Sequence, residues 1–267
     1  MGDGTVSMGA MVAAVLLSSR TLAPLAQMAN LFGRFNNAKT SYQRLAAFME
    51  ETKEAAEAQQ SSSVIRRPSI GDLEFRSVNF RYPGQEVDTL VGVNLKIQKG
   101  EKVAILGRNG SGKTTLIKLS SGLFGSTDGI VTYDGVDTKQ IHDEDLSSSI
   151  GIVLQDVQLF SGSVIENITM GREGITQEDI VAAAKVSGLD EFLGKMPGGY
   201  ELVLQDKGNG LSGGQRQAIA ITRALVHKPS HFILDEPTSA MDMNAEQLYI
   251  KNFKEIYQDS TLIVVSH

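Results

Sequence analysis

The chain has 267 residues, of which 25 are Lys or Arg and 31 are Asp or Glu, and its formal net charge is −6. A hydrophobic content of 41% with 21% charged residues is typical of a folded protein and excludes wholesale disorder. The acidic balance argues against nucleic acid as the main partner, because neutralising phosphates takes a surplus of Lys and Arg. The absence of cysteine excludes disulfides and thiolate metal sites.

The N-terminal region differs in charge from the rest of the chain. Residues 1–70 carry seven basic and five acidic residues, whereas residues 71–267 carry 18 and 26. The uncharged runs 4–19 and 21–33 are each shorter than the roughly 20 apolar residues that a complete membrane-spanning helix needs. We expect residues 1–49 to be the C-terminal end of a transmembrane domain, that is, the tail of a helix that starts upstream and an amphipathic helix that leaves the membrane. The alternative is a buried amphipathic helix of a soluble protein.

A polar, Ser-rich stretch follows at residues 50–70 and reads as a solvated linker. From residue 71 the pattern is that of an α/β domain, which we expect to span residues 71–267. The runs 73–82 and 93–100 predict strands of an antiparallel layer, and a stretch of helical periodicity between residues 176 and 228 predicts an α-helical insertion.

Four continuous apolar runs predict buried strands of a parallel sheet: 103–107, 150–155, 231–236 and 261–267. The first leads into GRNGSGKT, Gly107–Thr114, which satisfies G-x-x-x-x-G-K-[ST] between a strand and a helix. Glycine allows the backbone to wrap closely around phosphate, and the N–H groups at the helix start supply positive charge. Lys113 adds a full charge, and the Thr114 hydroxyl is suited to Mg²⁺.

The run HFILDE ends in two adjacent carboxylates, Asp235 and Glu236. The first is suited to hold Mg²⁺, and the second to accept a proton from a water that attacks the γ-phosphate. These features predict a nucleotide triphosphatase, but they leave kinases, GTPases and motor ATPases open.

LSGGQ at Leu211–Gln215, followed by a helical pattern, narrows the field. The chain resembles the ABC transporter ATPases, whose signature is this motif. The resemblance implies a P-loop NTPase core of ABC type with an antiparallel β layer and an α-helical subdomain, preceded by a partial transmembrane helix. It implies ATP and Mg²⁺ as cofactors and a head-to-tail dimer in which the signature of one subunit contacts the ATP that the other holds.

The resemblance also assigns roles to individual residues. Tyr82 resembles the aromatic residue that stacks on adenine, Gln155 the Q-loop glutamine, and His267 the switch histidine. The implied cis contacts to ATP are Tyr82, Gly107, Asn109, Gly110, Ser111, Gly112, Lys113, Thr114, Thr115 and Gln155. The implied trans contacts are Ser212, Gly213, Gly214, Gln215 and Asp242. The implied Mg²⁺ ligands are Thr114, Gln155 and Asp235, and the implied catalytic residues are Glu236, His267, Gln155 and Lys113.

Two departures from the family pattern stand out. Gln205 and Asp206 occupy the place of a usual glycine–glutamate pair, and the chain stops at His267, so we expect a fragment truncated after the switch histidine, which alone is not expected to be a robust ATPase. Residues 156–168 are similar to exporters, and residues 22–45 are similar to the last transmembrane helix and exit helix of type I secretion ATPases.

The type I resemblance implies the location and the partners. It places the protein in the inner membrane with the ATPase domain on the cytoplasmic side. It implies a second nucleotide-binding domain in a homodimer, an exported protein substrate, a periplasmic adaptor and an outer-membrane channel, with no nucleic acid. The alternatives are a lipid or drug ABC exporter, a soluble ABC ATPase that acts on DNA or ribosomes, and a regulatory module that does not hydrolyse ATP.

Overall fold

The computed structural model describes residues 7–61, 65, 66 and 69–266, and it divides into two compact units, one up to Ser63 and one from Val64 onward. The first unit is a helix of 54 residues, α1 (Met8–Ser61), with Pro24 inside it. Residues 50–61, predicted as linker, are helical because they are rich in Ala, Glu, Lys and Gln, which favour helices. None of the helices in the described part of the chain contains a stretch long and apolar enough to cross a membrane.

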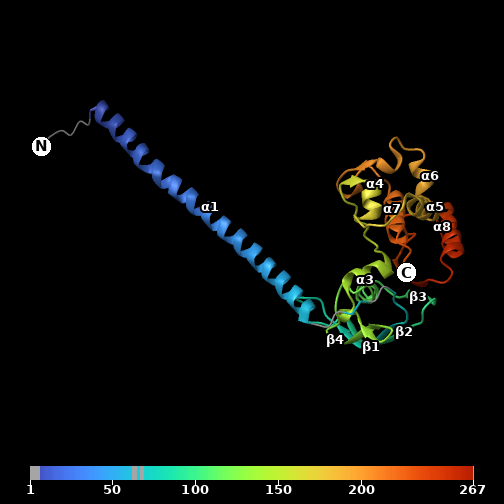
Figure 1. Cartoon of the computed structure of the whole chain (residues 1–267). Helices are drawn as coiled ribbons and strands as arrows, with labels where there is room; N and C mark the ends of the chain where they lie inside the picture. The colour runs from blue at the N-terminus through green and yellow to red at the C-terminus, as the bar shows by residue number, and fades with distance from the viewer. Residues whose placement is uncertain (1–6, 62–64, 67–68, 267) are drawn as a thin grey trace. The chain divides into compact units, whose positions relative to one another are not determined.

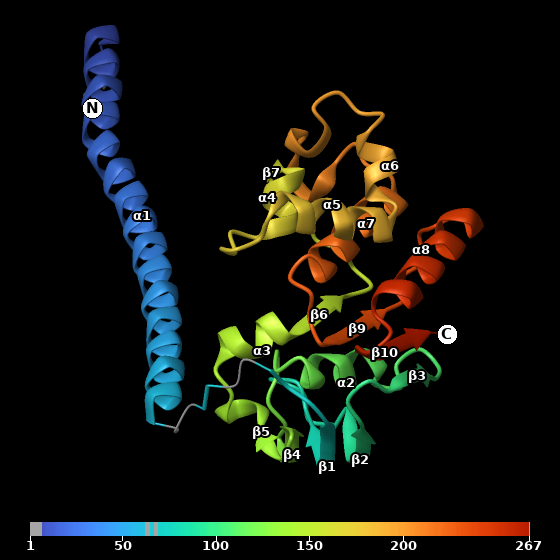
Figure 2. The same ribbon diagram turned by 45° about the vertical axis from the view of Figure 1, so that its right-hand side comes forward.

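The second unit contains two main sheets, whose strands are labelled in Figure 2. The antiparallel sheet has the order β2-β1-β4-β5. Its strands are β1 (Leu73–Phe80), β2 (Leu90–Ile97), β4 (Asp128–Tyr133) and β5 (Val136–Asp137). The parallel sheet has the order β3-β10-β9-β6. Its strands are β3 (Lys102–Leu106), β6 (Ile150–Val153), β9 (His231–Asp235) and β10 (Thr261–Ser266).

The helices of the second unit fall into groups. Helix α2 (Lys113–Ser120) follows β3, and α3 (Asp143–Ser149) precedes β6. The group between β6 and β9 comprises α4 (Val164–Thr169), α5 (Gln177–Ser187), α6 (Leu189–Leu193) and α7 (Gly213–Leu225), with the short pair β7 (Gly162–Ser163) and β8 (Val203–Leu204). These helices gather at the opposite end of the unit from β1, β2 and β4, as both views show (Figures 1 and 2). Helix α8 (Met243–Ile256) connects β9 to β10.

Two hydrophobic cores hold this arrangement. One lies between the sheets, where Phe75 and Tyr133 of the antiparallel sheet meet Ile117 of α2 and Ile233 of β9. The other joins α4–α8 to β9 and includes the fully buried Phe232. All five residues of β9 are buried, as expected of a central strand covered on both faces. The predicted antiparallel layer, parallel strands and helical insertion are therefore present, whereas β4, α3 and α8 were not predicted.

Candidate active site

The candidate site lies where the carboxyl ends of the parallel strands meet. In the sheet register, Val265 pairs with Ile105 on one side and with Asp235 on the other, and Val153 pairs with Leu234. Because parallel strands end at the same edge, the segments after β3, β6 and β9 converge there, although they are distant in the sequence. This convergence brings the glycine-rich loop, Gln155 and the Asp235–Glu236 pair together.

The glycine-rich loop connects β3 to α2 and needs glycine at its last position. Gly112 is the N-cap of α2 with φ of 91°, a left-handed conformation. A Cβ there would lie 2.7 Å from Cδ2 of Leu90, so any side chain would meet both backbone strain and a steric clash. No side chain of the described residues caps this N-terminus. The first N–H groups of α2 are therefore available to an anion.

Lys113 is the first residue of α2, directly after this loop, and is buried. Its Nζ donates hydrogen bonds to the carbonyl oxygens of Gly107, at 2.6 Å, and Arg108, at 3.2 Å. These bonds hold the ammonium group against the loop, where it lines a cavity of about 350 Å³. The full lining of this cavity is Thr89, Asn109, Gly110, Gly112, Lys113, Thr114, Thr115, Gln155, Asp235 and Glu236.

Thr114 and Asp235 are in direct contact in the lining of this cavity. The Thr114 hydroxyl donates a hydrogen bond of 2.8 Å to Oδ2 of Asp235, which is buried at the end of β9. In the described part of the chain, no three acidic or histidine side chains cluster closely enough to form a metal site by themselves. A hydroxyl, one carboxylate and the amide oxygen of Gln155 nevertheless fit Mg²⁺, which prefers oxygen ligands and usually takes few from the protein, with phosphate and water completing the set.

Glu236 follows Asp235 in a strained backbone conformation. Its φ is 48°, a left-handed value that is unfavourable for residues other than glycine. Residues in such strained conformations are concentrated at the functional sites of proteins. Its Oε2 accepts a hydrogen bond of 3.3 Å from Nε2 of Gln155. Gln155 and Glu236 thus share one cavity with Lys113 and Asp235.

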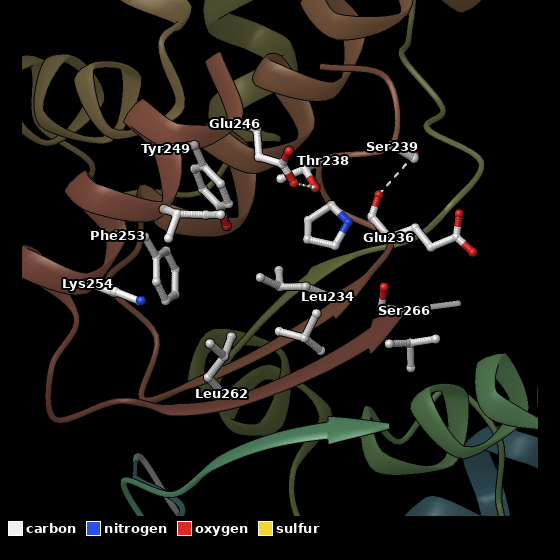
Figure 3. Close-up of a pocket in the computed structure, with 14 residues that line it drawn as sticks. Leu234, Glu236, Thr238, Ser239, Glu246, Tyr249, Phe253, Lys254, Leu262 and Ser266 are labelled. Carbon is white, nitrogen blue, oxygen red and sulfur yellow. Dashed lines mark hydrogen bonds between the residues drawn. The ribbon is translucent and has the colours of Figure 1, made fainter. Parts of the chain in front are cut away.

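Figure 3 shows that the Glu236 carboxylate points away from its own carbonyl group, which is bound by Ser239. A second cavity, of about 430 Å³, lies between β9, β10 and α8, and Glu236 belongs to its lining as well. Its lining is largely apolar and includes Leu234, Phe253 and Leu262. A hydrogen bond of 2.7 Å from Thr238 to Glu246 ties the turn to α8 at its edge.

Tyr82 lies beside the cavity and is not part of its lining. Its hydroxyl is hydrogen-bonded to that of Thr115 at 3.1 Å. Its ring packs edge-on against Phe80 and Phe124, with centroids 4.9 and 5.5 Å apart, and Lys118 Nζ lies 5.6 Å from its centroid. The ring is therefore half-buried among side chains, and the predicted stacking on adenine depends on its remaining exposed surface.

The signature residues start α7 and are hydrogen-bonded to one another. The Ser212 hydroxyl accepts from the N–H of Gln215 at 3.2 Å, and Oε1 of Gln215 accepts from the N–H of Ser212 at 2.8 Å. A Cβ at Gly214 would lie 3.0 Å from the carbonyl oxygen of Ala240, and one at Gly213 would lie 3.2 Å from the Ala240 side chain. Both glycines therefore permit close packing of α7 on the 236–242 turn. None of the four signature residues predicted to contact ATP lines the 350 Å³ cavity of this chain.

Two further predicted residues have other surroundings. Asp242 is the N-cap of α8, and its Oδ1 accepts from the N–H groups of Asn244 and Ala245 at 3.0 and 2.9 Å. Its carboxylate therefore stabilises the start of a helix within this chain.

His267 lies outside the described residues. Of the remaining predicted contacts, Ser111 and Gly107 belong to the loop, and the Ser111 N–H donates to the carbonyl of Arg108 at 3.1 Å.

Sequence reasoning missed Thr89 and Gln217. Thr89 lines the cavity from the end of the loop before β2. Gln217 is buried in α7 and bonds the backbone at Glu236 and Ala240. Neither residue belongs to a recognised motif. For Gln217 the sequence offers one indication: it lies on the apolar face of a predicted helix, where a buried polar side chain needs hydrogen-bond partners.

The sequence and the structure of this chain are similar to those of known proteins. The sequence profile described as "ABC transporter" matches residues 90–239, which include the glycine-rich loop, Asp235 and the signature. The chain belongs to the ABC transporter family. Its second unit has the mixed α/β nucleotide-binding fold of that family, with the antiparallel sheet present.

Named relatives cover nearly the whole chain. It is 38% identical over 262 residues to the cyclolysin secretion/processing ATP-binding protein CyaB of Bordetella pertussis, covering 98% of this chain and 36% of the relative. It is 38% identical over 265 residues to the leukotoxin translocation ATP-binding protein LktB of Mannheimia glucosida, covering 99% and 37%. The structure of a bacterial Atm1-family ABC exporter with ATP bound matches with a TM-score of 0.72 and 30% identity, over 78% of this chain and 36% of that one. The chain thus spans little more than a third of these proteins.

Proposed function

We propose that this chain is the ATP-hydrolysing part of a membrane ABC exporter, most similar to those of type I protein secretion. The observation that carries the proposal is the cavity itself: Lys113, the Thr114–Asp235 pair and the Gln155–Glu236 pair border one space. It combines a cationic anchor, oxygen ligands for a divalent cation and a carboxylate base, which are the parts that phosphoryl transfer to water needs.

In the proposed reaction, the phosphates of ATP bind at the N-terminus of α2, where the N–H groups and Lys113 neutralise their charge. Thr114, Asp235 and Gln155 would hold Mg²⁺, which would offset charge on the phosphate oxygens when bound. Glu236 accepts a proton from water as the water oxygen attacks the γ-phosphorus. The bond from that phosphorus to the bridging oxygen breaks, and ADP and phosphate leave. His267 is proposed to contact the γ-phosphate, and Tyr82 the adenine.

The second anion site, Ser212–Gln215, is proposed to act on the ATP of a partner subunit in a head-to-tail homodimer. The support is its place outside the chain's own cavity, at the start of a helix whose N–H groups carry positive charge. Asp242, at the end of the adjoining turn, is proposed to lie at the same contact.

The exporter class rests on the relatives. CyaB and LktB are named for the secretion of cyclolysin and the translocation of leukotoxin, and both align along almost the entire chain. We therefore propose a protein substrate, a periplasmic adaptor and an outer-membrane channel as partners. In this proposal residues 1–49 are the C-terminal end of a transmembrane domain in the inner membrane, residues 50–70 connect it to the ATPase domain, and residues 71–267 are that domain on the cytoplasmic side.

The test is ATP hydrolysis by the intact protein purified in detergent. Glu236→Gln should retain ATP binding and lose about 10²- to 10⁴-fold in kcat, because a general base contributes roughly that factor. Glu246→Gln is the matched control, since that side chain lies on α8 and can still accept the Thr238 hydrogen bond. Normal turnover by Glu236→Gln would remove this residue from the mechanism, and a wild-type protein without ATPase activity would refute the proposed function.

A further inference from the structure

Gln217 is a buried polar residue that the mechanism above does not use. It lies on α7, five positions after the N-cap Ser212, and 4% of it is exposed. Its Nε2 donates a hydrogen bond of 2.9 Å to the carbonyl of Glu236, and its Oε1 accepts one of 3.0 Å from the N–H of Ala240. The two partners fix the orientation of the amide, because only its nitrogen can donate and only its oxygen can accept.

The peptide groups of Glu236 are held at both ends. Its N–H donates to the carbonyl of Val265 on β10 at 3.1 Å. Its carbonyl accepts from Gln217 and also from the N–H and the hydroxyl of Ser239, at 3.2 and 3.0 Å; Figure 3 shows the last of these bonds. Such a set of bonds is what a residue with φ of 48° requires, because strained backbone persists only where its surroundings over-determine it.

The contacts of Gln217 join two parts of the site that are separate in the sequence. Its helix begins with the signature, and Gly213 and Gly214 pack against Ala240. The amide bonds the first residue of the turn and its fifth, Glu236 and Ala240. A shift of α7 along its axis would therefore pull on the backbone that carries the Glu236 carboxylate.

We propose that Gln217 is a positioning residue for ATP hydrolysis: it holds the strained backbone of Glu236 in register with the signature helix, so that the Glu236 carboxylate faces the attacking water. This inference rests on the proposed function, because it assigns to Gln217 the placement of the proposed base. Gln217 does not line the 350 Å³ cavity, so the inference assigns it no contact with ATP.

The experiment compares variants of the intact protein in detergent. Gln217→Met has a similar volume and removes both hydrogen bonds, and Gln217→Glu keeps an acceptor for Ala240 but no longer donates to Glu236. We expect each to lower kcat about 10- to 100-fold, the effect of a misplaced catalytic group, with the dissociation constant for ATP changed by less than about twofold. Ser239→Ala removes one of the three donors to the same carbonyl and should lower kcat by a smaller factor, about 2- to 10-fold.

The double variant separates positioning from a general loss of stability. If Gln217 and Ser239 act on one carbonyl, the factors for Gln217→Met and Ser239→Ala will not multiply. The matched control is Thr222→Val, on the same helix. Its buried hydroxyl bonds Ser187 and Ala218, away from the turn. Thr222→Val should lower the melting temperature as much as Gln217→Met does and leave kcat unchanged.

The outcomes are distinguishable. An unchanged kcat in both Gln217 variants, or a loss of kcat that Thr222→Val reproduces at equal thermal stability, overturns the positioning role and leaves the proposed function standing. A wild-type protein that binds ATP without hydrolysing it overturns the proposed function, and the inference with it. If Gln217→Met does not fold, Gln217→Glu and Ser239→Ala decide by the same criterion.

Discussion

The two helix starts that are proposed to bind ATP, those of α2 and α7, differ in how their N–H groups are used. Gly112 begins α2 with no side-chain cap among the described residues, and its loop opens on a cavity. Ser212 begins α7 with a complete capping box, in which Ser212 and Gln215 bond each other's N–H groups. The α2 start is thus open to phosphate within one chain, whereas at the α7 start the N–H groups of Ser212 and Gln215 are already bonded within the chain.

The largest effect of a substitution is expected on ATP binding at the start of α2. Lys113→Ala should weaken ATP binding about 10- to 100-fold, because hydrogen bonds between charged groups contribute roughly 1.5–3 kcal/mol. Titration of the intact protein with ATP measures this. Lys139→Ala is the control, since Lys139 binds the carbonyl of Ser126 and does not line the cavity. Unchanged affinity in Lys113→Ala would mean that the phosphates bind elsewhere, and the comparison would fail.

An intermediate effect is expected from a change of pH, which should alter the stability of the protein through His227, just after the C-terminal end of α7. Burial, with a smaller contribution from the Arg172 charge, lowers the pKa of His227 to about 4. Because the unfolded state binds this proton more tightly, the stability from neutral His227 is fully present above about pH 6.5 and is lost as the pH falls toward 4.

Lowering the pH from about 7 to about 5 should therefore destabilise the second unit by about 1–2 kcal/mol through this group, allowing for its partial exposure. Hydrogen exchange should show the end of α7 opening before the phosphate loop. His227→Gln should lose this part of the pH dependence, and His142→Gln, at a half-buried histidine that is the N-cap of α3, should keep it. Equal acid sensitivity in wild type and His227→Gln would contradict the assignment.

The smallest effect is expected at the capped start of α7. Ser212→Ala should lower the free energy of unfolding by about 1 kcal/mol even without nucleotide, because it removes a bond that the resting chain already makes. Denaturant unfolding measures this. Ser163→Ala is matched, since Ser163 forms the same capping box on α4, and it should cost as much without affecting hydrolysis. A Ser212→Ala protein as stable as wild type would show that the cap is not formed in solution.

Local patterns were sufficient for the parts of the site whose geometry is local. Glycine spacing between an apolar strand and a helix predicted the loop around Gly112, and a buried run ending in acids predicted where Asp235 and Glu236 lie. Asp242 shows a local signal that was read for one role only: an Asp before an amphipathic stretch also predicts an N-cap, and with it α8.

Contacts between distant segments could not be predicted in this way. The ring of Tyr82 packs on Phe124, and the amide of Gln217 reaches residues 19 and 23 positions away. Nothing in the spacing of either residue specifies its partner, because these contacts depend on how the sheets and helices pack. The helical state of residues 50–61 could have been predicted from their helix propensity. The prediction of a linker gave more weight to their polarity.

The strand order has a consequence for the synthesis of the protein. Among the strands that the structure describes, β3, which leads into the phosphate loop, pairs with β10 alone, and β10 is the last of them in the sequence. The ribosome therefore makes the loop some 150 residues before the strand that fixes it in place. Contacts of such long sequence separation form late, so we expect a nascent chain to gain its affinity for nucleotide only after β10 has been made.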